Sequence, residues 1–149
     1  MSIPYDLFTG AFLSKVTEYD FLALPDEERE AIVDGYMKRA ISAFAPICKV
    51  DLIGTADDDE REFNVDETAV DCDELADIIS EGMLMNWMKP YLYRQENLEN
   101  ALSTRDFTVF SPAELLKSIR AAYAAVCKHF RGMMNEYSYR HGDLTALHM

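Results

Sequence analysis

The chain has 149 residues, of which 49% are hydrophobic, so it is long enough and apolar enough to bury a core as one domain. Its formal net charge of −13 disfavours sequence-independent binding to nucleic acid, because phosphates would be repelled. The sequence contains no apolar run of roughly 18 residues and no signal-peptide pattern, which predicts no membrane span and a reducing cytoplasm as the place of synthesis.

Two amphipathic helices are predicted in the first third of the chain. The apolar residues that recur at helical spacing over 4–16 are Tyr5, Phe8, Phe12 and Leu13. A second helix is predicted to start near Pro25, with carboxylates in its first turn, and to stop before Pro46. Its predicted apolar face consists of Ile32, Tyr36, Ala40, Ile41 and Phe44. Both helices are expected to dock their apolar faces on a common core.

An acidic loop is predicted in the middle of the chain. The mixed apolar run 47–53 can be extended, and 54–66 is polar and typical of an exposed, mobile loop, with an optional brief strand around 61–65. This loop contains four consecutive carboxylates, Asp57, Asp58, Asp59 and Glu60.

The third predicted helix spans 72–88 and is apolar on most sides, which is typical of a helix buried on most sides. Its apolar residues are Leu75, Ile78, Ile79, Met83, Met85, Trp87 and Met88. The methionines with Trp87 indicate core packing, with an adaptable binding groove as the alternative. Pro90 is predicted to end or kink the helix, and 95–102 is predicted to be helical again.

A long C-terminal helix is predicted over 111–139. Ser111 can cap it, Pro112 suits its first position, and the predicted buried stripe contains Leu115, Ile119, Tyr123, Val126, Phe130, Met133 and Tyr137. The basic residues on its other faces are Lys117, Arg120, Lys128 and Arg131. Gly142 is a predicted helix stop within a tail, 140–149, whose apolar residues are Leu144 and Leu147. The expected fold is mainly α, a single helical-bundle domain over 1–149.

No residue pattern predicts a catalytic, cofactor or metal site. A calcium loop starting at Asp57 would need Gly at the position of Glu62, and the three histidines lack ligand spacing. Loose divalent binding and an enzyme that uses paired carboxylates remain alternatives. Cys48, Cys72 and Cys127 form no C-x-x-C pair and are expected to be buried free thiols.

Charge is divided unevenly along the sequence. Residues 57–81 carry twelve acidic side chains and one basic side chain, whereas 105–141 carry six basic and three acidic ones. The basic face of the long helix can therefore meet the acidic segment of a second copy, which is a heterologous contact that closes into a ring if the rotation permits. The equally open alternative is that the two segments match within one chain.

Several segments resemble a known family: ISEGM (79–83), WMKPY (87–91), QENLEN (95–100), FSPAELL (110–116) and EYSYRHGDL (136–144). They resemble a small structural protein encoded among the head and neck genes of long-tailed bacteriophages, similar to the head–tail connector (adaptor) proteins. The resemblance implies a homo-oligomeric ring of about a dozen copies beneath the portal protein. It also implies an extended DNA channel, a site for the next neck or tail component, and docking of the tail 140–149 onto the portal.

The predicted function is thus a non-enzymatic virion structural protein of the neck, made in the host cytoplasm, with no sequence-specific nucleic acid and no membrane as partners. The alternative is a small acidic cytoplasmic regulatory or inhibitor protein that binds a basic partner surface. The expected interface residues are Lys117, Arg120, Lys128, Arg131, Asp57, Asp58, Asp59, Glu60, Leu144 and Leu147.

Overall fold

The computed structural model describes residues 2–16, 25–66, 70–102 and 112–141, with the side chains of 91, 94–102 and 112–116 outside this description. The elements in chain order are β1 (Ser2–Pro4), α1 (Tyr5–Leu13), α3 (Asp26–Phe44), β2 (Ala56–Asp57), β3 (Glu62–Asn64), α4 (Cys72–Leu102) and α5 (Pro112–His141). The predicted mainly α class is therefore confirmed, including the long C-terminal helix.

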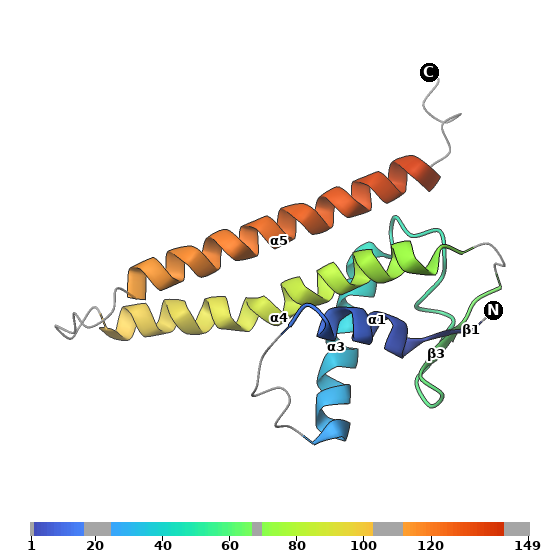
Figure 1. Ribbon diagram of the computed structural model, residues 1–149, viewed down its shortest axis with the longest axis horizontal. Coiled ribbons are helices and arrows are strands. Elements are labelled where there is room, and N and C mark those ends of the chain that lie inside the picture. Colours follow the sequence, from blue (N-terminus) through green and yellow to red (C-terminus); the bar gives the residue numbers. More distant parts are fainter. Residues whose placement is uncertain (1, 17–24, 67–69, 103–111, 142–149) are drawn as a thin grey trace.

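The molecule consists of a head and a projecting arm (Figure 1). In the head, α1 and α3 lie against the N-terminal half of α4, with the small sheet beside α1, and the C-terminal half of α5 lies along the other side of α4. The arm is the remainder of the same two antiparallel helices, which extend together beyond α1 and α3. The arm therefore has only two layers, whereas the head is enclosed by several elements.

The core lies where α1, α3, α4 and α5 meet in the head. Its largest fully buried side chains are Tyr5, Phe8, Phe12, Phe44, Phe63, Ile3, Met37, Leu75, Ile78, Ile79 and Met83. Aromatic rings from α1 pack on the sheet, with Tyr5 and Phe8 centred 4.7 Å and 5.6 Å from Phe63. The prediction that the first helix docks its aromatic side is thus confirmed, although Leu13 at its end is 37% exposed.

The buried face of α3 differs from the predicted one. Val33 and Met37 are buried, whereas Ile32 is 40% exposed and Tyr36 is half-buried. Val33, Met37, Ala40 and Phe44 follow one another at spacings of four and three residues, so they form a complete stripe without Ile32. The prediction for Ala40, Ile41 and Phe44 is confirmed, and the prediction for Ile32 is wrong because the helix turns this stripe toward α4.

The segment predicted as an exposed loop forms most of a three-stranded antiparallel sheet in the order β1-β3-β2. Ile3 pairs with Phe63, and both side chains are buried on the core face of the sheet. The optional strand around 61–65 is confirmed as β3, and the prediction that 54–66 is wholly exposed is wrong because Phe63 and Val65 are buried. Residues 47–53 form turns and bends and no strand, and Leu52 is buried there.

The helix α4 continues through Pro90 to Leu102, so the predicted end at residue 88 is wrong. Pro90 lacks the N–H that would bond the carbonyl of Asn86, and Figure 1 shows a change of direction in the middle of α4. The helix is maintained across this defect because α5 packs along it.

The prediction of a core helix holds for the first half of α4. Ile79 and Met83 are fully buried, whereas Met85 and Trp87 are half-buried at the edge of the core. Both side chains pack against the core from its edge, so the predicted core packing is confirmed for them with partial burial. Replacement of Trp87 by alanine is expected to cost less than the roughly 3–5 kcal/mol that is typical of a fully buried large aromatic residue.

Gly82 marks the closest approach of three helices. A Cβ atom at this position would lie 2.8 Å from Ala40 Cβ of α3 and 2.8 Å from Phe130 Cζ of α5. The Gly82→Ala variant is therefore expected to lose about 1–2 kcal/mol of unfolding free energy, because overpacking outweighs the gain in helix propensity. Urea denaturation measures the loss.

The same substitution at Gly132 is the matched control for the Gly82 variant. Gly132 lies in α5, and an added Cβ there meets no atom within 4 Å. Gly132→Ala is expected to gain about 0.5–1 kcal/mol from helix propensity alone. Equal effects of the two substitutions would contradict the tight crossing at Gly82.

Candidate functional site

The helix α5 has a buried face and an exposed basic face. The predicted stripe packs toward α4, with Phe130 and Tyr137 buried and Ile119, Tyr123, Val126 and Met133 half-buried. This part of the prediction is confirmed, and the side chain of Leu115 lies outside the described residues. The position of α5 on α4 is thus set by apolar contacts along one side of the helix.

The opposite face carries four exposed basic side chains, Lys117, Arg120, Lys128 and Arg131, which we call the basic ridge. Their spacings of three, eight and three residues place them within one face, and the ridge is about 21 Å long at 1.5 Å per residue. The chain contains no carboxylate from 117 to 135. Among the described residues, Lys117, Lys128 and Arg131 form no ion pair, so most of the ridge charge is not neutralised within the described part of the chain.

Other basic residues of α5 do match the acidic segment within the chain. His129 Nδ1 lies 3.0 Å from Glu81 Oε1 of α4. Arg140 Nη2 lies 2.9 Å from Glu74 Oε1, and His141 Nε2 lies 3.0 Å from Glu74 Oε2. In the C-terminal half of α5, basic residues therefore pair with the acidic segment of the same chain, as the second alternative predicts. The basic ridge, in contrast, points away from α4.

The buried carboxylate of Glu81 connects three elements. Lys15, in the turn after α1, donates a hydrogen bond of 2.9 Å to Glu81 Oε2, while His129 of α5 meets Oε1. Burial raises the pKa of the Glu81 carboxyl, but the bonds with Lys15 and His129 outweigh it, so the pKa lies below its ordinary value. The ionised form of Glu81 therefore stabilises the folded head.

The Glu81→Gln variant is expected to lose part of the acid sensitivity of folding. A carboxyl whose pKa is lower in the folded state contributes stability above its unfolded pKa, about 4.5, and this stability is lost as pH falls through the folded pKa. Unfolding free energies from pH 7 to 3 should fall less steeply for the variant than for the wild type. The exposed Glu136→Gln is the control, and identical slopes for wild type and Glu81→Gln would contradict this role.

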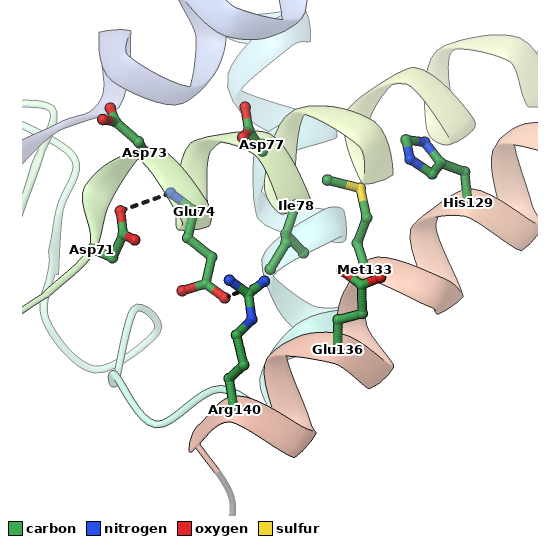
Figure 2. Close-up of a pocket in the computed structure, with 9 residues that line it drawn as sticks. All are labelled: Asp71, Asp73, Glu74, Asp77, Ile78, His129, Met133, Glu136 and Arg140. Atoms are coloured by element: carbon green, nitrogen blue, oxygen red, sulfur yellow. Dashed lines mark hydrogen bonds and ion pairs between the residues drawn. The ribbon is translucent and has the colours of Figure 1, made fainter.

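An open groove of about 450 Å³ lies between the start of α4 and the end of α5 (Figure 2). Its lining residues are Asp71, Asp73, Glu74, Asp77, Ile78, His129, Met133, Glu136 and Arg140. We call it the acidic groove, because five carboxylates line it against one guanidinium and one imidazole. Asp71 accepts a hydrogen bond of 3.1 Å from the Glu74 amide, so it caps α4 and belongs to the helix start.

The four predicted acidic interface residues lie in β2 and the turn before β3. Asp57 accepts hydrogen bonds from the amides of Asp59 and Glu60, so it stabilises its own turn. Figure 1 shows the sheet and α5 on opposite sides of α4. The structure therefore does not bring this cluster to the basic ridge of the same chain.

Asp58 has partners on two helices. It accepts a 2.7 Å hydrogen bond from the Tyr5 hydroxyl and pairs with Lys38 of α3. The bond from Tyr5, with that from Lys38, holds the pKa of Asp58 below its ordinary value. Burial, together with Asp58, raises the pKa of Tyr5. Asp58 is therefore at least partly structural, whereas Asp59 and Glu60 are exposed.

Arg61 forms a charge cluster that sequence reasoning missed. Its guanidinium reaches Asp6 of α1 and both Glu30 and Asp34 of α3 at 2.7–2.9 Å. In the sequence, Arg61 is the one basic residue of the acidic segment 57–81. No local pattern links it to partners 27 and 55 residues away.

The structure also bears on the remaining predictions. Within the described residues, no three His, Cys, Asp or Glu side chains are grouped to hold a metal ion. No helix in that part of the chain has the length and apolar character that a membrane span requires.

Cys48, Cys72 and Cys127 are free thiols as predicted, but they are half-buried and not fully buried. Leu144 and Leu147 lie outside the described residues, and the predicted tail starts too early because Arg140 and His141 belong to α5.

Comparisons with protein-family models, curated proteins and solved structures gave no match.

Proposed function

We propose that this protein is a non-enzymatic structural subunit that assembles into a ring-forming head–tail connector of a long-tailed bacteriophage, between the portal and the tail. The observation that carries the proposal is the basic ridge: a row of exposed cations on a chain of net charge −13. Lys117, Lys128 and Arg131 of this row form no ion pair among the described residues, which favours a partner with an acidic surface. Copies of the same chain supply such surfaces.

The sequence resemblance to the connector proteins supports the same proposal independently. The segments that carry it fall largely on α4 and α5, the helices that form the arm and position the ridge. A strongly acidic protomer also suits a ring around a DNA channel, because a wall that repels phosphate lets DNA pass without holding it.

The proposal is tested on purified virus particles. Mass spectrometry should find the protein at a fixed ratio to the portal, and labelled particles should show it in the neck. Absence of the protein from the particles would overturn the proposal. A monomer in solution alone would not, because such subunits can assemble only on the portal.

Deletion of residues 144–149 is expected to prevent incorporation into particles, because Leu144 and Leu147 are the apolar anchors that the resemblance implies for docking on the portal. Particle composition after complementation with the truncated gene measures this. The Leu144→Ala with Leu147→Ala variant, which keeps the chain length, should give the same loss. Normal incorporation of both would remove the tail from the proposed docking site.

The acidic groove favours a second candidate, an acidic regulatory protein that occupies a basic surface on a host partner. Asp71, Asp73, Asp77 and Glu136 are all exposed there. Capture of partners from host lysate distinguishes the candidates. A single host protein that is retained by the wild type and lost with Asp73→Lys and Asp77→Lys would favour the regulator.

A further inference from the structure

We propose that the basic ridge of one copy docks into the acidic groove of a second copy. This inference rests on the proposed function, because it specifies the contact between neighbouring subunits. It names the two faces and the residues on each that meet.

The ridge provides two pairs of cations on one face of α5, which together span about 21 Å. The side chains between its charged residues are small, with Ala121, Ala124 and Ala125 all exposed. Short side chains leave the ammonium and guanidinium groups as the most prominent features of the helix. A partner surface can therefore approach the helix closely while the cations reach its carboxylates.

The groove provides the complementary shape and charge. Asp73 and Asp77 are exposed and lie one turn apart on α4, so their Cβ atoms are separated by about 5–6 Å. Lys128 and Arg131 are three residues apart on α5 and have nearly the same separation. The two pairs can therefore meet side chain to side chain, with Glu136 at the edge of the groove.

The buried carboxylate at the groove is already paired within the chain. The Glu74 side chain is 9% exposed, and its Oε1 atom lies 2.9 Å from Arg140 Nη2, an interaction that Figure 2 marks with a dashed line. The exposed carboxylates of Asp73 and Asp77 are therefore the groups that a cation of a second copy meets first.

The two faces of one molecule cannot meet each other. The ridge faces away from α4, whereas the groove lies between α4 and the end of α5. The contact is consequently heterologous, with the ridge of each copy in the groove of the next, and repetition closes into a ring or continues as a chain. Complementary charge fixes the register and accelerates encounter.

Sedimentation velocity of four double variants tests the inference. Lys128→Glu with Arg131→Glu reverses the ridge, and Asp73→Lys with Asp77→Lys reverses the groove. Each variant alone is expected to weaken self-association at least tenfold, and an equimolar mixture should restore it, because the reversed ridge fits the reversed groove. The control for the ridge variant is Lys49→Glu with Lys89→Glu, which changes the net charge by the same amount at exposed sites outside the ridge. This control should associate like the wild type. Glu27→Lys with Glu28→Lys, at exposed sites of α3, is the corresponding control for the groove variant.

Thermal unfolding of each variant checks that the variant is folded. Restoration of self-association by mixing also requires that both variants fold. Self-association of the wild type should also weaken about tenfold between roughly 50 and 500 mM salt, as expected for exposed charges.

Three results would overturn the inference while leaving the proposed function to its own test on particles. The first is a wild type that stays monomeric at low salt and about 1 mM, where even a contact of millimolar Kd is roughly 40% occupied. The second is self-association or particle incorporation that both reversed variants retain. Binding of wild type to duplex DNA that Lys128→Glu with Arg131→Glu abolishes would assign the ridge to nucleic acid and likewise overturn it.

Discussion

Replacement of Arg61 with alanine is expected to lower the free energy of unfolding by about 2–4 kcal/mol, slightly below the cost of breaking a fully buried ion pair. The Arg61 side chain is 23% exposed and that of Asp34 is 19% exposed. Loss of the guanidinium leaves Asp6, Glu30 and Asp34 close together without a cation. Their mutual repulsion adds to the loss of the bonds themselves.

The geometry explains why one residue has so large an effect. Nε and Nη2 of Arg61 bind both carboxylate oxygens of Asp34 at 3.1 and 2.8 Å, while Nη1 reaches Asp6 and Glu30. The bond with Asp34, followed by that with Asp6, raises the pKa of Arg61 above its already high ordinary value, against the opposing effect of burial. Arg61 thereby links the turn before β3 to α1 and α3, in addition to the apolar contacts of Phe63 with α1.

A second substitution separates charge from backbone conformation at the same position. Arg61 has φ of 52°, the left-handed region in which a non-glycine residue is strained by about 1–2 kcal/mol. Arg61→Gly should therefore cost about 1 kcal/mol less than Arg61→Ala. Urea denaturation measures both variants. Arg29→Ala, which removes an exposed pair with Asp26, should change stability by less than about 0.5 kcal/mol. A similar small effect for Arg61→Ala would contradict the cluster.

Replacement of Tyr137 with alanine is expected to cost about 3–5 kcal/mol, as for a buried large aromatic residue. The side chain is 3% exposed, and its ring centroid lies 4.8 Å from that of Phe44 and 4.3 Å from that of His141. Its hydroxyl accepts a 3.0 Å hydrogen bond from the Lys49 amide. Tyr137 thus joins the end of α5 to the end of α3 and the following turn.

The Tyr137→Phe variant separates the hydroxyl from the ring. It should cost about 1–2 kcal/mol, because the Lys49 amide loses its acceptor while the ring contacts remain. Burial raises the pKa of Tyr137 to about 12. The stability that it contributes is therefore complete below the ordinary tyrosine pKa near 10 and is lost as pH rises toward 12. Thermal unfolding at pH 7 to 11 should show a smaller alkaline loss for the phenylalanine variant than for the wild type.

The sequence predicts the helical elements well and their long-range contacts poorly. The stripe that ends at Phe130 and Tyr137 repeats over many turns, so periodicity alone predicts both the helix and its buried face. The face of α3 is less determined, because Ile32 and Val33 are both apolar and the choice depends on how α4 packs against the helix.

The small sheet and the charge pairs could not be predicted for a different reason. The strands are two or three residues long, and β1 pairs with a segment about 60 positions away, as in the bridge between Ser2 and Asn64. Such short strands have no measurable alternation of polar and apolar residues. Charge counts predict that α5 is basic and 57–81 acidic. They do not reveal that Arg140 forms an ion pair with Glu74, whereas Lys128 forms none with a carboxylate among the described residues.

The unequal support of α4 and α5 along their length has a consequence for how the chain opens. Amides around Ile79 and Phe130 are surrounded by other elements, so their deuterium exchange requires disruption of the whole head. In the arm, the same helices are backed by each other alone among the described elements, and Tyr93 of α4 is 55% exposed. Amides near the tip can therefore exchange by fraying of one hairpin, and a neighbour bound along that hairpin would slow them without altering the rest of the molecule.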